Sequence, residues 1–186
     1  MQWRWTMAGV VVFGILAAGP ASAQVRDIDG HPFTPFTPSG KAQVVFFVAT
    51  DCPVSNSYAP QIQRICKEYG EKGVSCSLSY EDVRVDPATV RTHLRSYGYR
   101  DIPVAIDADR ALADRVHASI TPEAFVIDAR GMIRYQGRID NLYSSLGKTR
   151  QVVTEHDLTD ALDAVLTGRP VARTKTEAIG CFIPRD

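Results

Sequence analysis

Cys52 is the residue of this sequence that is best placed to do chemistry. It lies in Phe46-Phe47-Val48-Ala49-Thr50-Asp51-Cys52-Pro53-Val54-Ser55-Asn56, where an apolar run ends and a proline follows. This order predicts a thiol between a buried strand and the first turn of a helix. Unpaired backbone N–H groups and the positive end of the helix dipole favour the thiolate at such a position. Because the thiolate is the nucleophile in disulfide and peroxide chemistry and also binds soft metals, Cys52 is the candidate redox residue.

Ser55 occupies the position three residues after Cys52, where a Cys-x-x-Cys site would have its second cysteine. A local disulfide therefore cannot form. The Ser55 hydroxyl could donate a hydrogen bond to a Cys52 thiolate or could cap the helix, and we expect the capping role. A thiol partner for Cys52 has to come from elsewhere in the chain.

Cys66 and Cys76 are expected on inward faces, one late in the first helix and one in the strand that follows. They are either two small buried hydrophobic residues or a structural disulfide that joins helix and strand. Cys66 cannot pair with Cys52, because the two lie near opposite ends of one helix, roughly 20 Å apart at a rise of 1.5 Å per residue.

Cys181 stands in a polar tail, where a cysteine has little packing reason to exist. The neighbouring Ile179, Phe182 and Ile183 could dock this tail onto an apolar surface. We hypothesise that Cys181 is the resolving thiol for Cys52, since loop-closure entropy does not forbid so long a connection. A free thiol and an intermolecular disulfide are the alternatives.

Two histidines and one arginine are further candidates. His93 falls on a predicted helix and is expected to be solvated or to cap it. His117 precedes a proline loop and could approach Cys52, to tune its pKa or bind a metal, but we favour an ordinary loop histidine. Arg138 could stabilise a thiolate or form a local pair with Asp140.

The ends of the chain differ in character from its middle. Arg4, an apolar run over 7–18 and the small residues Ala21-Ser22-Ala23 predict a secretory signal peptide over residues 1–23. The run is short for a membrane span, which needs about 20 residues. The alternative is an uncleaved anchor, and only in that case would the protein be attached to a membrane. We expect an exported protein, periplasmic or secreted, whose thiols can stay paired.

Size and charge limit the class of protein. The chain has 186 residues, enough for one domain with a sizeable core. Its 21 basic and 21 acidic residues give no reason to expect a nucleic-acid or membrane-surface partner. We place one domain over 24–168 and a C-terminal tail that carries Cys181 over 169–186.

The domain alternates between strand and helix patterns. Strands are expected at 42–49, 74–80, 103–106, 123–128 and 132–137, and helices at 55–69, 87–97, 110–116 and 157–166. Asp86 and Pro87 give the second helix an N-cap and a first residue. The order predicts an α/β sandwich whose sheet is parallel at first and ends in an antiparallel hairpin.

At this point the residues resemble a known group. Phe47-Val48-Ala49-Thr50-Asp51-Cys52-Pro53 resembles the Phe-Trp-Ala-Thr-Trp-Cys-Pro segment of TlpA-like thiol-disulfide proteins. These are thioredoxin-fold redoxins, grouped with the alkyl hydroperoxide reductase/thiol-specific antioxidant proteins. Ile120-Thr121-Pro122 resembles the cis-proline loop of the fold, and 128–140 its terminal hairpin. Over 25–168 the resemblance implies a thioredoxin-like three-layer sandwich, with a central mixed sheet, a C-terminal β-hairpin and a closing helix.

The resemblance also implies roles for Thr121 and Pro122. If the bond between them is cis, its bend brings the backbone of Thr121 beside Cys52, where main-chain hydrogen bonds could hold a mixed-disulfide partner. Two departures matter. Cys52-Pro53-Val54-Ser55 replaces the redox pair, and Ala49 and Val45 stand where peroxiredoxins have Thr or Ser and Pro. A full peroxiredoxin site is therefore not expected.

These observations predict an exported thiol-dependent oxidoreductase or antioxidant protein, with Cys52, Cys181, Ser55, Thr121 and Pro122 as its site. Cys52 would react with protein disulfides or small peroxides, giving a mixed disulfide or a sulfenic acid. Cys181 or an external thiol reductant would resolve it, and no organic cofactor is required.

Two other classes of protein stay open. One is a copper-binding thioredoxin-fold chaperone, a group whose Cys-Pro-x-x-x-Cys site is completed by a distant histidine. Here Asn56-Ser57 stands where its second cysteine would be, and His117 is the candidate histidine. The other is a non-catalytic interaction domain, in which Cys52 would have an ordinary, high pKa.

Overall fold

The computed structural model describes residues 25–82 and 84–184. The predicted signal peptide, residues 1–23, lies outside the described residues. Within the described part, none of the helices combines the length and the apolar character that a membrane crossing needs.

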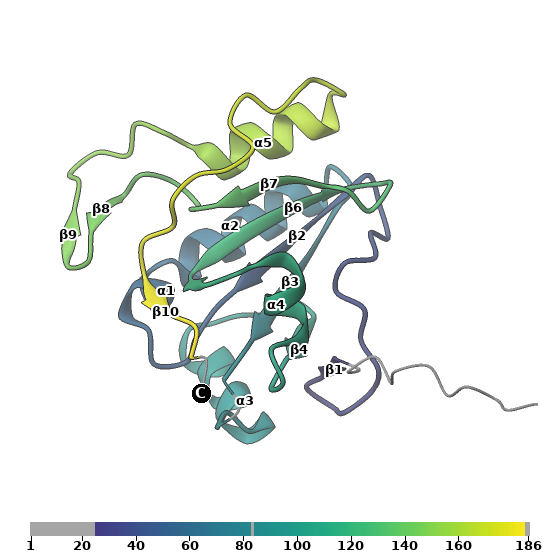
Figure 1. Ribbon diagram of the computed structural model, residues 1–186, viewed down its shortest axis with the longest axis vertical. Coiled ribbons are helices and arrows are strands. Elements are labelled where there is room, and N and C mark those ends of the chain that lie inside the picture. Colours follow the sequence, from purple (N-terminus) through teal and green to yellow (C-terminus); the bar gives the residue numbers. More distant parts are fainter. Residues whose placement is uncertain (1–24, 83, 185–186) are drawn as a thin grey trace, which may run out of the picture.

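A six-stranded mixed sheet forms the middle of the molecule (Figure 1). Its strands, in spatial order, are β1 (Arg26–Asp27), β4 (Val104–Ile106), β3 (Val74–Tyr80), β2 (Ala42–Phe47), β6 (Glu123–Asp128) and β7 (Ile133–Gly137). β2 runs parallel to β3, and β3 to β4, whereas β6 and β7 complete the sheet in antiparallel order. The expected parallel start and antiparallel hairpin are confirmed.

The helices cover both faces of this sheet. They are α1 (Pro53–Ser57), α2 (Ala59–Gly70), α3 (Pro87–Ser96), α4 (Ala111–Val116) and α5 (Asp157–Leu166). Successive side chains of a strand face opposite layers, so Val44 and Phe46 of β2 join the larger core cluster, with α2 and α5. Val45 and Phe47 join the smaller cluster, with α4. The result is the three-layer thioredoxin-like sandwich that the sequence predicts.

The first helix of the prediction is divided in two. Tyr58 ends α1 and is the N-cap of α2, in which Pro60 lies within the first turn and is therefore tolerated. A disulfide joins Cys66 of α2 to Cys76 of β3, with their Cα atoms 5.7 Å apart. Of the two alternatives for this pair, the structural disulfide is the one found, and it leaves Cys52 and Cys181 as free cysteines.

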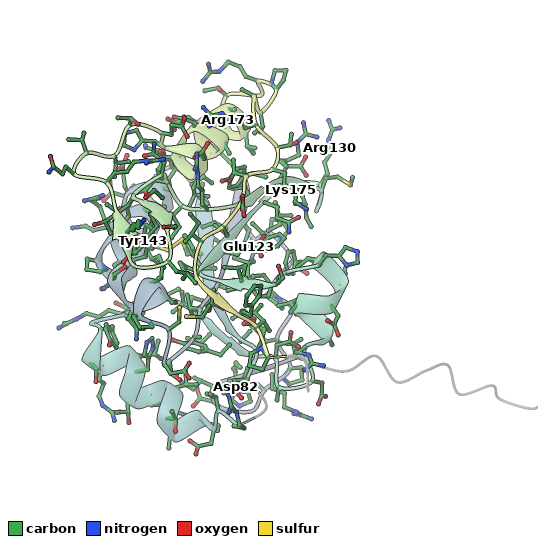
Figure 2. All side chains as sticks on the ribbon, turned by 60° about the vertical axis from the view of Figure 1, so that its left-hand side comes forward. Asp82, Glu123, Arg130, Tyr143, Arg173 and Lys175 are labelled. Atoms are coloured by element: carbon green, nitrogen blue, oxygen red, sulfur yellow. A yellow bond between two sulfur atoms is a disulfide. The ribbon has the colours of Figure 1, made fainter. Side chains whose placement is uncertain are left out.

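The sequence patterns missed five short strands, β1 of the main sheet and four that lie outside it. The hairpin of β8 (Tyr143–Ser145) and β9 (Lys148–Thr149) lies beside α1, and β5 (Ile120–Thr121) pairs with β10 (Cys181–Phe182). β10 belongs to the tail, which therefore folds back onto the domain. Figure 2 shows the tail as a yellow ribbon that runs from Arg173 past Glu123 toward the end of the molecule where Asp82 lies.

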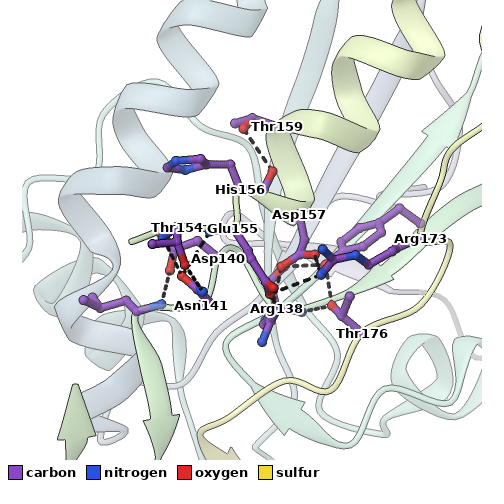
Figure 3. A network of polar contacts seen from close by, with 12 residues as sticks. Arg138, Asp140, Asn141, Thr154, Glu155, His156, Asp157, Thr159, Arg173 and Thr176 are labelled. Carbon is purple, nitrogen blue, oxygen red and sulfur yellow. Dashed lines mark hydrogen bonds and ion pairs between the residues drawn. The ribbon is translucent and has the colours of Figure 1, made fainter. Parts of the chain in front are cut away.

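Polar contacts hold the first part of the tail against β7 and α5. The backbone of Gln136 accepts a hydrogen bond from Thr176 N–H and donates one to the Thr174 carbonyl. Arg173 donates to Asp157, which is buried and also accepts from Arg138 at 2.7 Å (Figure 3). These contacts fix the path by which the tail reaches the other end of the sheet.

The expected local pair of Arg138 with Asp140 is wrong. Arg138 binds Asp157 and Glu155, which follow the β8–β9 hairpin. Asp140 instead accepts hydrogen bonds from the Tyr58 hydroxyl, at 2.6 Å, and from Gln61. The two side chains therefore serve different elements, which their closeness in the sequence does not reveal.

Candidate active site

Cys52 lies at the junction that the sequence predicts, just after β2 and as the N-cap of α1. Its side chain has no exposed surface. The sulfur accepts a hydrogen bond from the Ser55 N–H at 3.4 Å, and the thiol donates one to the Thr121 carbonyl at 3.1 Å. A sulfur that caps a helix faces unpaired N–H groups, which stabilise a thiolate more than a neutral thiol.

Thr121 and Pro122 form the loop that the resemblance implies. The peptide bond between them is cis, and Thr121 is the last residue of β5. The hydrogen bond from Cys52 ends on the carbonyl of Thr121, so the structure brings Cys52 and this backbone together.

Cys181 completes the cluster from the far end of the sequence. β10 pairs with β5 in antiparallel register, so that Cys181 stands opposite Thr121 and Phe182 opposite Ile120. The approach is close, because a Cβ at Gly180 would overlap the Thr121 carbonyl. Ile183 is buried in the smaller core cluster and anchors this end of the tail, whereas Phe182 is exposed, contrary to the expectation that it docks.

The two free thiols interact with each other. Burial raises the pKa of Cys181 to about 12, and a hydrogen bond with Cys52, the negative charge of Cys52 and that of Asp51 all add to the rise. The side chains of Cys52 and Cys181 therefore lie close enough to interact.

Ser55 has neither of the roles that the sequence suggests. Cys52, not Ser55, is the N-cap of the helix, which corrects the expected capping role. The buried Ser55 hydroxyl accepts a hydrogen bond from the Ala49 N–H at 3.3 Å. Ser55 thus ties the strand end to the helix start, and it faces Cys52 through its backbone N–H.

Of the two histidines, His117 agrees with the favoured prediction of an ordinary loop residue, whereas His93 does not agree with its prediction. His117 is exposed at the C-cap of α4, and no contact between it and Cys52 is found in the described part of the chain. His93, expected to be solvated, is buried between the Tyr80 hydroxyl at 2.9 Å and the Asn56 side chain at 2.7 Å. Burial lowers the pKa of His93. Its spacing of three from the buried Val90 was the available signal for this inward position.

A cavity of about 130 Å³ opens beside the cluster. Cys181 and Thr121 line it, together with the loop of Thr50 and Asp51 just before Cys52. Glu81, which the sequence analysis did not single out, also lines it and is only 3% exposed. Glu81 and Asp82 follow the strand pattern in succession, and nothing in that order distinguishes a buried carboxyl group from an exposed one.

Solved structures share this fold. An uncharacterized conserved protein from Geobacillus kaustophilus matches at 24% identity, with 88% of each chain covered and a TM-score of 0.76. A hypothetical protein from Sinorhizobium meliloti 1021 matches at 28% identity, covering 88% of this chain and 90% of its own, with a TM-score of 0.73. A secreted disulfide oxidoreductase of Mycobacterium tuberculosis, homologous to E. coli DsbE, matches at 17% identity over 79% of this chain and 96% of its own (TM-score 0.55).

A search of curated proteins found no match. The model of the AhpC/TSA family matches residues 5–136, which include Cys52 and Pro122 and end before the tail that carries Cys181. That span is more than half of the chain and agrees with the thioredoxin-like architecture. The chain therefore belongs to the AhpC/TSA family, and it is a redoxin-type oxidoreductase with a thioredoxin-like fold.

Proposed function

We propose that this protein is an exported thiol–disulfide oxidoreductase in which Cys52 and Cys181 cycle between two thiols and one disulfide. The observation that carries the proposal is the pairing of β10 with β5, which holds Cys181 opposite Thr121 while the Thr121 carbonyl binds Cys52. Cys181 thus takes the place of the second cysteine of a Cys-x-x-Cys site, whose position is occupied here by Ser55.

The reaction begins at Cys52. Its thiolate attacks one sulfur of a substrate disulfide, an S–S bond forms between Cys52 and that sulfur, and the other substrate sulfur leaves as a thiolate that takes up a proton. The Cys181 thiol then loses its proton and attacks the sulfur of Cys52. This step forms the Cys52–Cys181 disulfide and releases the second substrate thiol. An external dithiol reduces the pair and is itself oxidised to a disulfide.

The order of attack follows from the environment of the two thiols. The raised pKa of Cys181 keeps it protonated when Cys52 is a thiolate, because an anion beside a second anion in a buried site is unfavourable. We assign the attack to Cys52, whose sulfur caps the start of α1, and the resolution to Cys181, whose pKa burial raises.

Disulfides fit this site better than peroxides do. The hydroxyl and proline positions of a peroxiredoxin site are filled by Ala49 and Val45, which offer no side-chain hydrogen bond to a peroxide. Copper binding would have to rest on the Cys52 and Cys181 thiols, since His117 is exposed at the C-cap of α4 and no contact with Cys52 is found in the described part of the chain.

Export is supported by two separate observations. Residues 1–23 have the pattern of a secretory signal peptide, and the Cys66–Cys76 disulfide belongs to an oxidising compartment. Cell fractionation of the full chain, followed by mass spectrometry of the N-terminus, tests this: a mature chain beginning at Gln24 in the periplasm or medium is expected. A cytoplasmic chain that retains Met1 would contradict it.

Peptide mapping of the oxidised protein tests the redox pair. We expect one linked peptide pair that contains Cys52 and Cys181, and its loss in Cys181→Ser. The matched control is the double variant Cys66→Ser and Cys76→Ser, which removes the other disulfide and must keep the linked pair. Turnover of a peroxide without a linked pair, or stoichiometric Cu(I) binding without thiol turnover, would contradict the proposal.

A further inference from the structure

Glu81 is a buried carboxyl group on the face of the sheet that is covered by the C-terminal tail carrying Cys181. In parallel register Ser77 of β3 pairs with Val45 and Ser79 with Phe47, so both serines face the smaller core cluster. Glu81 follows by the same alternation, at the point where the strand ends. The tail covers this face through Ile183, which belongs to that cluster.

Neither carboxyl oxygen of Glu81 has a hydrogen-bond partner among the described residues. A buried polar group without partners is costly, and such groups in folded proteins call for an explanation. Burial raises the pKa of Glu81 well above its ordinary value, and the charge of Asp107 raises it further, while the nearby Ser79 hydroxyl offsets part of the rise. The carboxyl group is thus suited to gain and lose a proton closer to neutral pH.

The cavity connects Glu81 with Cys181. Both residues line it, and its volume of about 130 Å³ exceeds what one water molecule needs. The lining is mostly apolar, but water that hydrogen-bonds to its polar groups, Glu81, Asp51 and Thr121 among them, can carry a proton between two side chains. The other titratable or charged groups that surround Glu81 are Asp51, Tyr80, Asp82, Arg84 and Asp107.

Of these groups, Glu81 is the buried carboxyl group whose oxygens have no hydrogen-bond partner among the described residues. Asp51 is exposed, and the Tyr80 hydroxyl is hydrogen-bonded to His93. Asp82 pairs with Arg84 at 2.8 Å, and that pairing lowers its pKa. Asp107 accepts two backbone N–H bonds at the start of α4, from Leu112 and Ala113.

Resolution by Cys181 needs such a group. Burial raises the pKa of the Cys181 thiol, so this thiol is protonated at neutral pH before it attacks. The attack on Cys52 therefore requires the proton to leave as the new bond forms. We propose that Glu81 accepts the proton of Cys181 through the cavity when the Cys52–Cys181 disulfide forms, and returns it when the disulfide is reduced. This inference rests on the proposed function.

The step balances in atoms and electrons. The Cys181 sulfur forms a bond to the Cys52 sulfur, the bond from Cys52 to the substrate sulfur breaks, and the substrate leaves as a thiolate. The proton of Cys181 passes to the Glu81 carboxylate and then to solvent. In the reductive half-reaction, protonated Glu81 gives a proton to the Cys181 thiolate as the external thiol attacks Cys52.

An aromatic disulfide, 5,5′-dithiobis(2-nitrobenzoate), separates the two steps in a stopped-flow experiment. The first coloured thiolate is released when Cys52 attacks, and the second when Cys181 resolves the mixed disulfide. The second phase is expected to be independent of reagent concentration and to vanish in Cys181→Ser. If it persists in Cys181→Ser, the proposed function fails, and the inference about Glu81 fails with it.

Glu81→Gln then tests the inference alone. We expect the second phase to slow about 10²-fold near neutral pH, the usual scale of general acid–base catalysis. The wild-type rate should level off above the pKa of Glu81. The variant's rate should instead climb about tenfold per pH unit over roughly pH 7 to 9, since it depends on the Cys181 thiolate alone.

The matched control is Asp82→Asn, which removes a carboxyl group from the rim of the same cavity and should keep the wild-type profile. The glutamine side chain has nearly the shape of glutamate and carries no buried charge, so folding is preserved. A Cys181-dependent second phase with the same rate and pH profile in Glu81→Gln as in the wild type would overturn the role of Glu81 and leave the redox pair standing.

Discussion

Replacing Gly180 by alanine should loosen the docking of the tail. A Cβ at Gly180 would overlap the carbonyl group of Thr121, and backbone atoms cannot rotate out of the way. Forcing a methyl group into a packed site costs about 1–3 kcal/mol. That cost lowers the equilibrium constant for docking about 5–150-fold. The same carbonyl accepts the hydrogen bond of Cys52, so the change also reaches the Cys52 thiol.

Hydrogen exchange measures the docking equilibrium directly. The Ile183 N–H donates to the Ser119 carbonyl at 2.9 Å and exchanges when the tail opens. In Gly180→Ala we expect the protection of the Ile183 N–H against exchange to fall by the same factor of about 5–150. The rate of the second, Cys181-dependent release phase should fall with it. The matched control is Gly70→Ala at the end of α2, where an added Cβ meets no atom within 4 Å. Wild-type protection and a wild-type rate in Gly180→Ala would refute the claim that close docking at Thr121 presents Cys181.

Three further predictions concern stability, each measured by urea unfolding. Replacing both Cys66 and Cys76 by alanine should cost about 2.5 kcal/mol, as expected for a sequence separation of 10, without changing the two release phases. Asp157→Asn should lower the free energy of unfolding by about 1–3 kcal/mol. The loss is smaller than for a fully buried ion pair, because Arg173, which binds Asp157 together with Arg138, is 55% exposed. An unchanged urea midpoint would contradict the anchoring role of Asp157. Burial raises the pKa of Glu81 in the folded state. The wild type should therefore lose stability relative to Glu81→Gln as the pH rises above the ordinary glutamate value of 4.5. A difference in free energy of unfolding that does not change with pH would contradict the burial of this carboxyl group.

The fold was largely predictable, because most of its helices and strands have a recognisable pattern in their own residues. A continuous Val/Phe run predicts β2, and alternating serines predict β3. Asp86 followed by Pro87 predicts the start of α3. The five short strands were missed, because two or three residues give no period to detect. The tail was expected to be polar and peripheral, yet its contacts with Gln136 and Asp157 bind it to the domain.

The site was predictable where chain order decides it. Cys52 had to follow a buried strand and precede a helix, so the sequence alone placed it. Thr121 and Pro122 were placed through the family resemblance, and Thr121 is the last residue of β5. Ser55 was misread, since the choice between its hydroxyl and its backbone N–H depends on a contact with Ala49 that no spacing reveals.

Only the tertiary structure decided which distant groups meet. The pairing of Cys181 with Thr121 depends on a tail that crosses the sheet and buries Ile183, and the position of Glu81 depends on what covers the end of β3. Burial and long-range register arise from packing between segments far apart in the chain, and a local pattern carries no record of them. The sequence thus determined that Cys52 is positioned to react, and the packing of the tail determined which thiol stands beside it.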